Sequence, residues 1–289
     1  MASVTTPADL TITPRDRRFG RGQDKSRWWH GGDPIATAFY NALSATFPKG
    51  EKLFIDSVRA FRDGAPPKLA AEIRAFVTQE AMHTREHEEF NGKLEAAGYD
   101  IAPLLRDVDG RLALLAGRPK IASLAATMAL EHFTAILAHE LLRDPRHLAG
   151  ADKASADLWR WHAIEEVEHK AVAHDTWMHA TRGWTRAKRW KVKSLLMLIV
   201  TRNFLIDRTK GILELLRQDG LTGPAIWARV AWYAFGRPGM MRRVAALWAV
   251  YFLPGFHPWK HDDRALIAAA ERELGGEGPP RHRFEPQPA

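Results

Sequence analysis

Residues 161–170, WHAIEEVEHK, carry three side chains that can bind a metal ion from one helical face. His162, Glu166 and His169 stand at positions i, i+4 and i+7. At about 100° per residue on an α-helix, they fall within an arc of about 60°. Buried polar groups need partners, and a metal ion can pair two imidazoles and a carboxylate at once. Taken alone, the stretch also fits a hydrogen-bonded core histidine beside a solvated glutamate.

Acidic and imidazole residues also interrupt other predicted helices. Residues 67–97 and 120–143 read as long helices with apolar stripes at helical spacing, and residues 51–62 read as a shorter helix that starts with glutamate. At positions where a helix that only packs in the core would have Leu, these stripes have residues that can bind a metal. The interrupting residues are Glu51, Glu80, His83, His87 and Glu131.

Together these residues match the pattern of ferritin-like dinuclear carboxylate bundles. Such bundles take one Glu from each of two helices and a Glu-x-x-His pair from each of the other two. Four inward carboxylates need a cationic charge of about +4 to offset their repulsion and burial. The sequence therefore predicts an all-α, ferritin-like four-helix bundle with a dinuclear metal site. A mononuclear site, or Glu and His pairs that are merely structural, are the alternatives.

Several motifs extend a resemblance over most of the chain. WHGGDP, FPKGEKLFIDSVR, QEAMHTREH, ALEHFTA, WHAIEEVEHKAVAHD and FHPW resemble the bacterial family of predicted metal-dependent hydrolases. More distantly, the bundle alone is similar to the arylamine N-oxygenases, di-iron enzymes of ferritin-like fold with an added His ligand one turn before the last Glu-x-x-His. The long C-terminal half has no counterpart there, which leaves the substrate open. The resemblance implies the ligands Glu51, Glu80, His83, Glu131, His162, Glu166 and His169.

Two neighbours of this ligand set are candidate catalytic residues. His87 lies one turn beyond His83 on the same arc, and we interpret it as supporting a ligand or handling protons rather than as a ligand. Glu165 lies at the edge of the arc, where it could replace or hydrogen-bond a ligand, or be solvated. The remaining candidates are expected outside the site: His132 as a core or surface histidine, Glu168 as a solvated carboxylate, and His139, His174 and His179 for lack of matching partners.

Composition narrows the choice of chemistry and of partners. The 289 residues include no cysteine, so any metal must be held by His and carboxylate. The formal charge of +8 lies largely in the C-terminal half, but no nucleic-acid motif accompanies it, so nucleic acid is not an expected partner. The N-terminus lacks a secretory signal, and the longest apolar runs, 195–200 and 245–253, are too short to span a bilayer. We expect a soluble, cytoplasmic protein.

Pro and Gly signals divide the chain into four parts. Residues 1–30 are predicted as an extended arm, 31–183 as the metal-binding bundle, 184–274 as a Trp- and Arg-rich helical region packed on it, and 275–289 as a disordered tail. Linkers are expected at the breaks, including one from Gly98 to Pro119. The other predicted helices cover 34–46, 152–181, 185–219, 224–235, 237–252 and 262–274.

The ligand set suggests three functions. Oxygen and nitrogen ligands suit Fe, Mn or Zn. The leading hypothesis is an O2-dependent di-iron oxidoreductase that hydroxylates, desaturates or N-oxygenates a small or lipid-like hydrophobic substrate, with electrons from a donor protein. The first alternative is a dimetal hydrolase that uses a metal-bridging water, with His87 or Glu165 as general base. The second is metal storage or a structural metal.

The C-terminal half suggests a further partner. Amphipathic helices with Lys and Arg beside Trp, Phe and Leu can lie in a membrane interface, which would suit a lipid-like substrate and place the protein at the inner face of the membrane. Alternatively, the tryptophans cover the bundle or form a contact in a homodimer.

Overall fold

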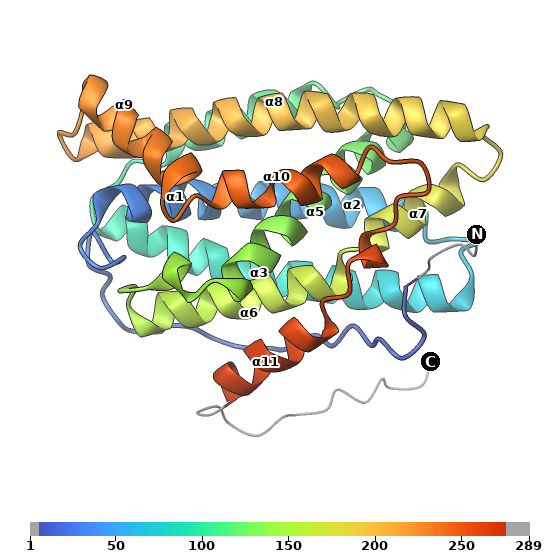
Figure 1. The fold of residues 1–289 in the computed structure, drawn as a ribbon, viewed down its shortest axis with the longest axis horizontal. Coiled ribbons are helices and arrows are strands. Elements are labelled where there is room, and N and C mark those ends of the chain that lie inside the picture. The colour runs from blue at the N-terminus through green and yellow to red at the C-terminus, as the bar shows by residue number, and fades with distance from the viewer. Residues whose placement is uncertain (1–5, 276–289) are drawn as a thin grey trace.

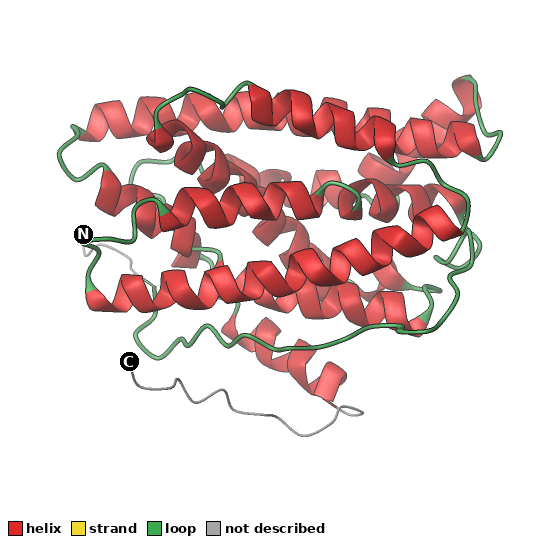
Figure 2. Ribbon diagram, turned by 180° about the vertical axis from the view of Figure 1, so that it is seen from behind, coloured by secondary structure: helices red, strands yellow, loops and turns green. Residues whose placement is uncertain are grey.

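The computed structural model describes residues 6–275, and within that range the chain is all-α (Figures 1 and 2). The β-type pairing found there is an isolated antiparallel bridge between His30 and Ala151. The predicted tail, apart from Gly275, lies outside the described residues. The elements are α1 (Pro34–Ser44), α2 (Phe47–Arg59), α3 (Pro67–Ala96), α4 (Ala102–Ala113), α5 (Lys120–Arg143), η1 (Pro145–Leu148), α6 (Lys153–His169), α7 (Val172–Ala180), α8 (Arg186–Gln218), α9 (Pro224–Ala231), η2 (Trp232–Gly236), α10 (Met240–Val250), η3 (Pro258–Lys260) and α11 (Arg264–Gly275).

A local signal explains where α1 begins. Asp33 caps α1, because its side chain accepts hydrogen bonds from the backbone N–H groups of Ile35 and Ala36, and Pro34 occupies the first helical position. The long helices α3 and α5 follow the predicted ranges 67–97 and 120–143 closely. For these elements the expectation from sequence is confirmed.

Three expectations about helix boundaries are wrong. The FPKG segment does not precede α2 but forms its first turn, since Pro48 fits an N-terminal helical position. Residues 102–113, which were expected to be linker, form α4. The single helix predicted over 152–181 is interrupted between α6 and α7, although Lys170 and Ala171 keep right-handed helical torsion angles. The interruption directly follows the last predicted metal ligand, His169.

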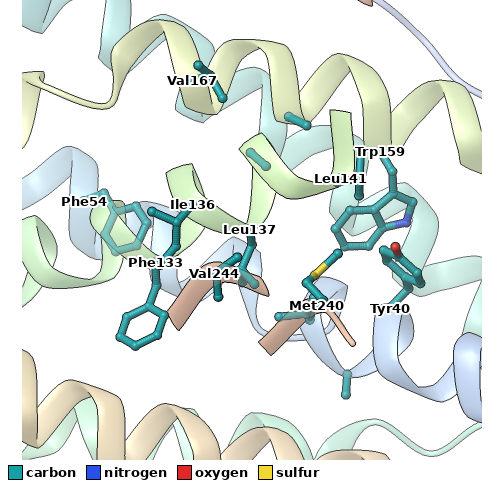
Figure 3. Close-up of a cluster of buried hydrophobic side chains, with 14 of the residues drawn as sticks. Tyr40, Phe54, Phe133, Ile136, Leu137, Leu141, Trp159, Val167, Met240 and Val244 are labelled. Atoms are coloured by element: carbon teal, nitrogen blue, oxygen red, sulfur yellow. The ribbon is translucent and has the colours of Figure 1, made fainter. Parts of the chain in front are cut away.

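Helix α5 is the central element of the fold. It packs against α2, α6, α7, α8 and α10, while α2 also packs on α3 and α3 on α6. Figure 3 shows Phe133, Ile136 and Leu137 of α5 close to Met240 and Val244 of α10. The helices that carry the predicted ligands therefore surround one shared interior.

Among the described residues, α5 is also the one helix long and apolar enough to cross a membrane by length and composition. However, 67% of its most apolar window is buried inside the fold. The core helix of a globular protein passes the same test, and the burial of α5 is typical of such a helix.

The C-terminal helices form a layer over the bundle. Figure 1 shows α8 along the upper edge of the molecule, with α10 below it and α3 and α6 further from it. Helix α8 packs on α1 and α5. Two tryptophans join α8 to the α10 segment: Trp248 donates to Thr201 Oγ1 at 2.9 Å, and Trp190 donates to the Phe252 carbonyl at 2.8 Å.

Lys193 of α8 joins the same layer and makes stability depend on pH. Its ammonium group is buried, donates to the Tyr251 carbonyl at 2.6 Å and lies over the ring of Phe256. Burial, together with the nearby charge of Lys260, lowers the pKa of Lys193 from 10.5 to about 8. Below pH 8, Lys193 is charged in the folded chain, and the free-energy cost of burying this charge lowers the stability in full.

We expect the free energy of unfolding to rise as the pH increases from 8 to 10.5, because in this window the unfolded chain still binds the proton that folded Lys193 has released. The slope from this group should approach about 1.4 kcal/mol per pH unit. Chemical denaturation at several pH values would measure it. The slope should fall by this amount in Lys193→Met and be unchanged in Lys191→Met, since Lys191 is exposed. Equal slopes in both variants would contradict the assignment.

Candidate metal centre

Four helices bring the seven predicted ligands together in the interior. Helix α2 supplies Glu51, α3 supplies Glu80 and His83, α5 supplies Glu131, and α6 supplies the three remaining ligands. None of the seven residues is more than 4% exposed. Carboxylates are rarely buried so completely unless they are paired or bind a metal.

His169 marks one end of the cluster. Its Nε2 atom lies 3.2 Å from Glu80 Oε1, 3.5 Å from Glu131 Oε2 and 3.6 Å from Glu166 Oε2. Three carboxylates from three different helices thus face one imidazole nitrogen. Donor atoms at such separations can share a single ion with only small movements.

The other end is formed by the remaining two histidines. His162 Nε2 lies 3.0 Å from Glu166 Oε1, and His83 Nδ1 lies 3.7 Å from the same oxygen. Ligand atoms of Glu51, Glu80 and His83 also lie within 4.8 Å of one another. Glu80 and Glu166 therefore contact groups at both ends, as carboxylates between two ions would.

Most of the carboxylate oxygens and imidazole nitrogens that face the interior of this cluster have no hydrogen-bond partner. An unpaired buried polar atom costs about 1–3 kcal/mol, so several of them at one point call for a cation. The donor set of carboxylate oxygens and imidazole nitrogens fits Fe, Mn or Zn. The unpaired atoms are Glu51 Oε1, both carboxylate oxygens of Glu80 and of Glu131, His83 Nδ1, Glu166 Oε2 and His169 Nε2.

Burial and mutual repulsion shift the pKa values of the carboxyl groups. Burial, reinforced by the neighbouring glutamates, raises the pKa of Glu51, Glu80 and Glu131 well above the ordinary value. Burial acts on Glu166 in the same direction, but His169 and His162 hold its pKa well below the ordinary value. Without cations, only one of the four is thus readily ionised, and cation binding must displace protons from the others.

Each of the three histidines predicted as ligands is held through its second ring nitrogen. His83 Nε2 lies 3.1 Å from Glu165 Oε2, and His169 Nδ1 lies 3.0 Å from Gln79 Oε1. Such contacts fix the orientation of the ring and leave the first nitrogen free for a metal. They are typical of metal-binding histidines and are not required of histidines that merely fill a core.

His87 supports the third histidine in the same way. Its Nε2 lies 2.8 Å from His162 Nδ1, and its Nδ1 lies 2.8 Å from Ser44 Oγ. The Ser44 hydroxyl donates to Asn91 Oδ1 at 2.8 Å. Both nitrogens of His87 are therefore engaged, one with His162 of the cluster and one with Ser44, which fits the supporting role, and its role in proton handling stays a prediction.

Glu165 and Glu168 are both buried next to the site. Glu165 contacts His83 as described, and burial raises the pKa of Glu165 to about 8, although Arg15 opposes the shift. The expectation that Glu168 is solvated is wrong: it is 4% exposed and accepts from Gln79 Nε2 at 2.9 Å. Helical spacing places Glu168 away from the ligand arc, but a further segment covers that side of α6.

That segment is the N-terminal arm, which runs along α6 (Figure 1). Arg15 Nη1 and Nη2 donate to the Glu168 carboxylate at 2.9 and 2.5 Å, and Nη2 donates to Glu271 of α11 at 2.5 Å. The backbone N–H of Arg15 donates to Glu165 Oε1 at 2.8 Å. One arginine thus holds both acidic groups that stand behind His83 and His169.

Two other groups of histidine and aspartate lie outside this centre. His139 and His261 meet Asp263, and His174 and His257 meet Asp175. Neither group needs a metal. In the first group, Asp263 Oδ2 already pairs with Lys170 Nζ at 2.5 Å. In the second group, His257 Nδ1 already accepts a hydrogen bond from a backbone N–H. Each group joins segments that lie 124 or 82 residues apart in the chain, so sequence spacing gave no sign of either.

The other two histidines singled out from the sequence are also accounted for. His132 is buried and donates from Nε2 to the Leu247 carbonyl at 3.1 Å, so it is a core histidine. His179 lies near Arg182 on the partly exposed end of α7. Neither faces the seven-residue cluster.

An apolar pocket reaches the cluster from one side. Its lining includes the two predicted ligands His162 and Glu166, the aromatic residues Tyr40 and Phe204, and Met240 of α10. Apart from those two predicted ligands, the described side chains that line it are uncharged. The pocket can therefore admit an apolar group next to the metal-binding atoms, covered by α8 and α10.

Comparison with protein families agrees with this centre. The chain matches the family model described as predicted metal-dependent hydrolase over residues 13–262. It therefore belongs to this family, as its motifs predicted. The matched region contains Arg15 and all seven predicted ligands. Searches of curated proteins and of solved structures returned no match.

The family and the buried clusters together define a metal-dependent protein class. The description of the family supports the hydrolase alternative better than the di-iron oxygenase that the ligand pattern had favoured. Buried His and Glu groups are present that can hold metal ions.

Proposed function

We propose that the chain is a dinuclear metal-dependent hydrolase built on a ferritin-like arrangement of α2, α3, α5 and α6. The observation that carries the proposal is the convergence of unpaired buried donor atoms from these four helices beside an apolar pocket. The family description supports hydrolysis as the reaction class.

In this proposal, His169 would help to hold one ion, and His83 and His162 would help to hold a second. Glu80 and Glu166 contact both ends, and Glu51 and Glu131 complete the set. Bound divalent ions would act as Lewis acids and lower the pKa of water. The acidic groups behind the histidines keep the imidazoles oriented, so the ions need little rearrangement to bind.

The chain's own residues would position the substrate. The pocket presents Tyr40, Phe204 and Met240 to an apolar group and excludes water from it. No free side-chain base lines this pocket, since His87 and Glu165 both make their hydrogen bonds elsewhere. An ester or amide with an uncharged, apolar acyl or aromatic group is the substrate class that fits.

The second candidate function is O2-dependent oxidation by two iron ions. The specific observation in its favour is the carboxylate-rich donor set, because carboxylates can change their binding mode as metals change oxidation state. The lack of a free side-chain base at the pocket is also a smaller obstacle to oxidation than to hydrolysis. Iron would supply the redox chemistry, with electrons from a donor protein.

Metal analysis followed by two activity assays would separate these functions. The full chain should be purified without added metal, analysed for metal content, then loaded with zinc or iron and assayed for cleavage of apolar aryl esters and for O2 uptake with a reductant. Two zinc ions per chain, ester cleavage and no O2 uptake would support hydrolysis. Two iron ions, near-ultraviolet absorption that bleaches on reduction and O2 uptake would support oxidation. A chain that binds no metal would contradict both.

A further inference from the structure

Exposed apolar side chains are concentrated in the C-terminal layer. Among the described residues, nine of the twelve large apolar side chains that are exposed lie between residues 190 and 253. Isolated exposed apolar residues are ordinary, but a concentration of them marks an interaction surface. The nine are Trp190, Leu195, Leu198, Ile199, Leu205, Trp227, Trp232, Phe235 and Leu253.

Helix α8 arranges part of this set in one stripe. Leu195, Leu198 and Ile199 are 56%, 52% and 45% exposed, and they lie between the exposed cations Lys191 and Arg202. At about 100° per residue, these five positions fall within an arc of about 100°. The opposite side of α8, which includes Met197 and Val200, is buried. We call these five residues the α8 face.

The two stretches of sequence that form most of the C-terminal layer carry charge of a single sign. Residues 176–206 and 220–261 contain no Asp or Glu at all. The nearest acidic residue on α8, Asp207, is held by Arg111 at 2.9 Å and is 9% exposed. The cations of these two stretches are Arg182, Arg186, Lys188, Arg189, Lys191, Lys193, Arg202, Arg229, Arg237, Arg242, Arg243 and Lys260.

We propose that the α8 face docks on the surface of an anionic lipid bilayer. A stripe of Leu and Ile between Lys and Arg is the arrangement of helices that lie in a membrane interface. The apolar side chains would enter the boundary between headgroups and acyl chains, and the cations would contact anionic headgroups. At the far end of the same layer, Trp227 of α9 and Trp232 of η2 are 56% and 66% exposed, as interfacial tryptophans are.

The same charges argue against a second copy of the chain on this face. Two copies that met through the α8 face would bring Lys191 and Arg202 against cations, with no exposed carboxylate from either stretch to pair with them. Like charges placed against each other at an interface cost several kcal/mol. An anionic surface would instead pair with Lys191 and Arg202.

Sedimentation with vesicles tests the proposal on the full chain. The probes are vesicles of phosphatidylcholine alone and vesicles with phosphatidylglycerol added, each at low and high salt. We expect binding to the anionic vesicles at low salt, weaker binding at high salt because salt screens the cations, and little binding to phosphatidylcholine. Absence of binding to anionic vesicles at low salt would overturn the proposal.

Two variants assign the binding to the α8 face. Lys191→Gln/Arg202→Gln should weaken partitioning onto anionic vesicles by about tenfold or more. The matched control Arg74→Gln/Lys153→Gln removes two exposed cations from α3 and α6, helices that lie away from α8 (Figure 1), and should have a much smaller effect. Leu195→Gln/Leu198→Gln/Ile199→Gln should abolish binding. Equal effects in test and control pairs would overturn the assignment.

A measurement on the native chain keeps the test independent of how the variants fold. Brominated lipids quench tryptophans that enter the interface, so anionic vesicles that contain them should quench the native protein. The quenching should decrease in Trp227→Phe/Trp232→Phe and persist in Trp161→Phe, since Trp161 is fully buried in α6. If the native chain instead self-associates, and the Leu195 triple variant is monomeric, the face is a dimer contact and the proposal is wrong.

Discussion

Replacing Glu131 with glutamine should leave the chain folded but weaken its binding of divalent metal by more than about a hundredfold. Loss of a residue that only supports a metal ligand typically costs 10–100-fold in affinity, and loss of a ligand itself should cost more. The stability of the metal-free protein should change by no more than about 1 kcal/mol, because glutamine has the shape of the protonated carboxyl group that burial favours at this position.

The pH dependence of metal binding gives a second measure of the same effect. Because burial raises the pKa of Glu51, Glu80 and Glu131, bound cations must replace protons. The affinity of the native chain should therefore rise with pH, and titration calorimetry in buffers of different ionisation enthalpy should detect released protons. Glu131→Gln should release fewer protons.

Glu140 provides a matched control on the same helix. It is also a buried glutamate of α5, but its carboxylate pairs with His147 at 3.2 Å and with Arg243 at 3.4 Å. Glu140→Gln should lower stability and leave metal affinity unchanged, the opposite of Glu131→Gln. Equal metal affinity in the native chain and in Glu131→Gln would show that Glu131 is not a ligand.

The second large effect is expected at Arg15. Arg15→Gln should lower the free energy of unfolding by about 3–5 kcal/mol, because it leaves Glu165 and Glu168 buried without their cation. It should also weaken metal binding by about 10–100-fold, since these carboxylates orient His83 directly and His169 through Gln79. Denaturant unfolding and metal competition assays would measure the two effects separately.

Arg18 supplies the control for this prediction. It lies three residues away on the same arm, but its side chain is 47% exposed and pairs chiefly with exposed Asp16. Arg18→Gln should change stability by less than about 1 kcal/mol. Arg15→Lys keeps the charge but cannot span three carboxylates, so it should be intermediate. If Arg15→Gln loses stability but binds metal like the native chain, the arm supports the fold and not the site.

The ligand helices could be read from the sequence because their signals are local. In α3 and α5, a long apolar stripe fixes the inward face, and Glu80, His83 and Glu131 occupy positions on that face. Capping residues such as Asp33 mark helix starts within a few residues. Periodicity and caps depend only on neighbours along the chain, so a single sequence is enough to predict them.

The surroundings of the ligands could not be read in this way. Arg15 meets Glu168 across 153 residues of chain and Glu271 across 256. Helical periodicity places Glu168 away from the ligand arc, and only the folded arm shows why that side is buried. In the same way, the break after His169 leaves the backbone torsion angles helical, so no Pro or Gly marks it.

The path of the N-terminal arm affects the order of events during biosynthesis. Arg15 of this arm makes its contacts with both α6 and α11. Among the described helices, α11 is the last to leave the ribosome. A nascent chain that has already formed α2, α3, α5 and α6 would still lack Glu271 of α11, the last carboxylate that holds the arm. Stable metallation should therefore follow completion of the polypeptide, and a chain shortened before α11 should take up metal and lose it quickly.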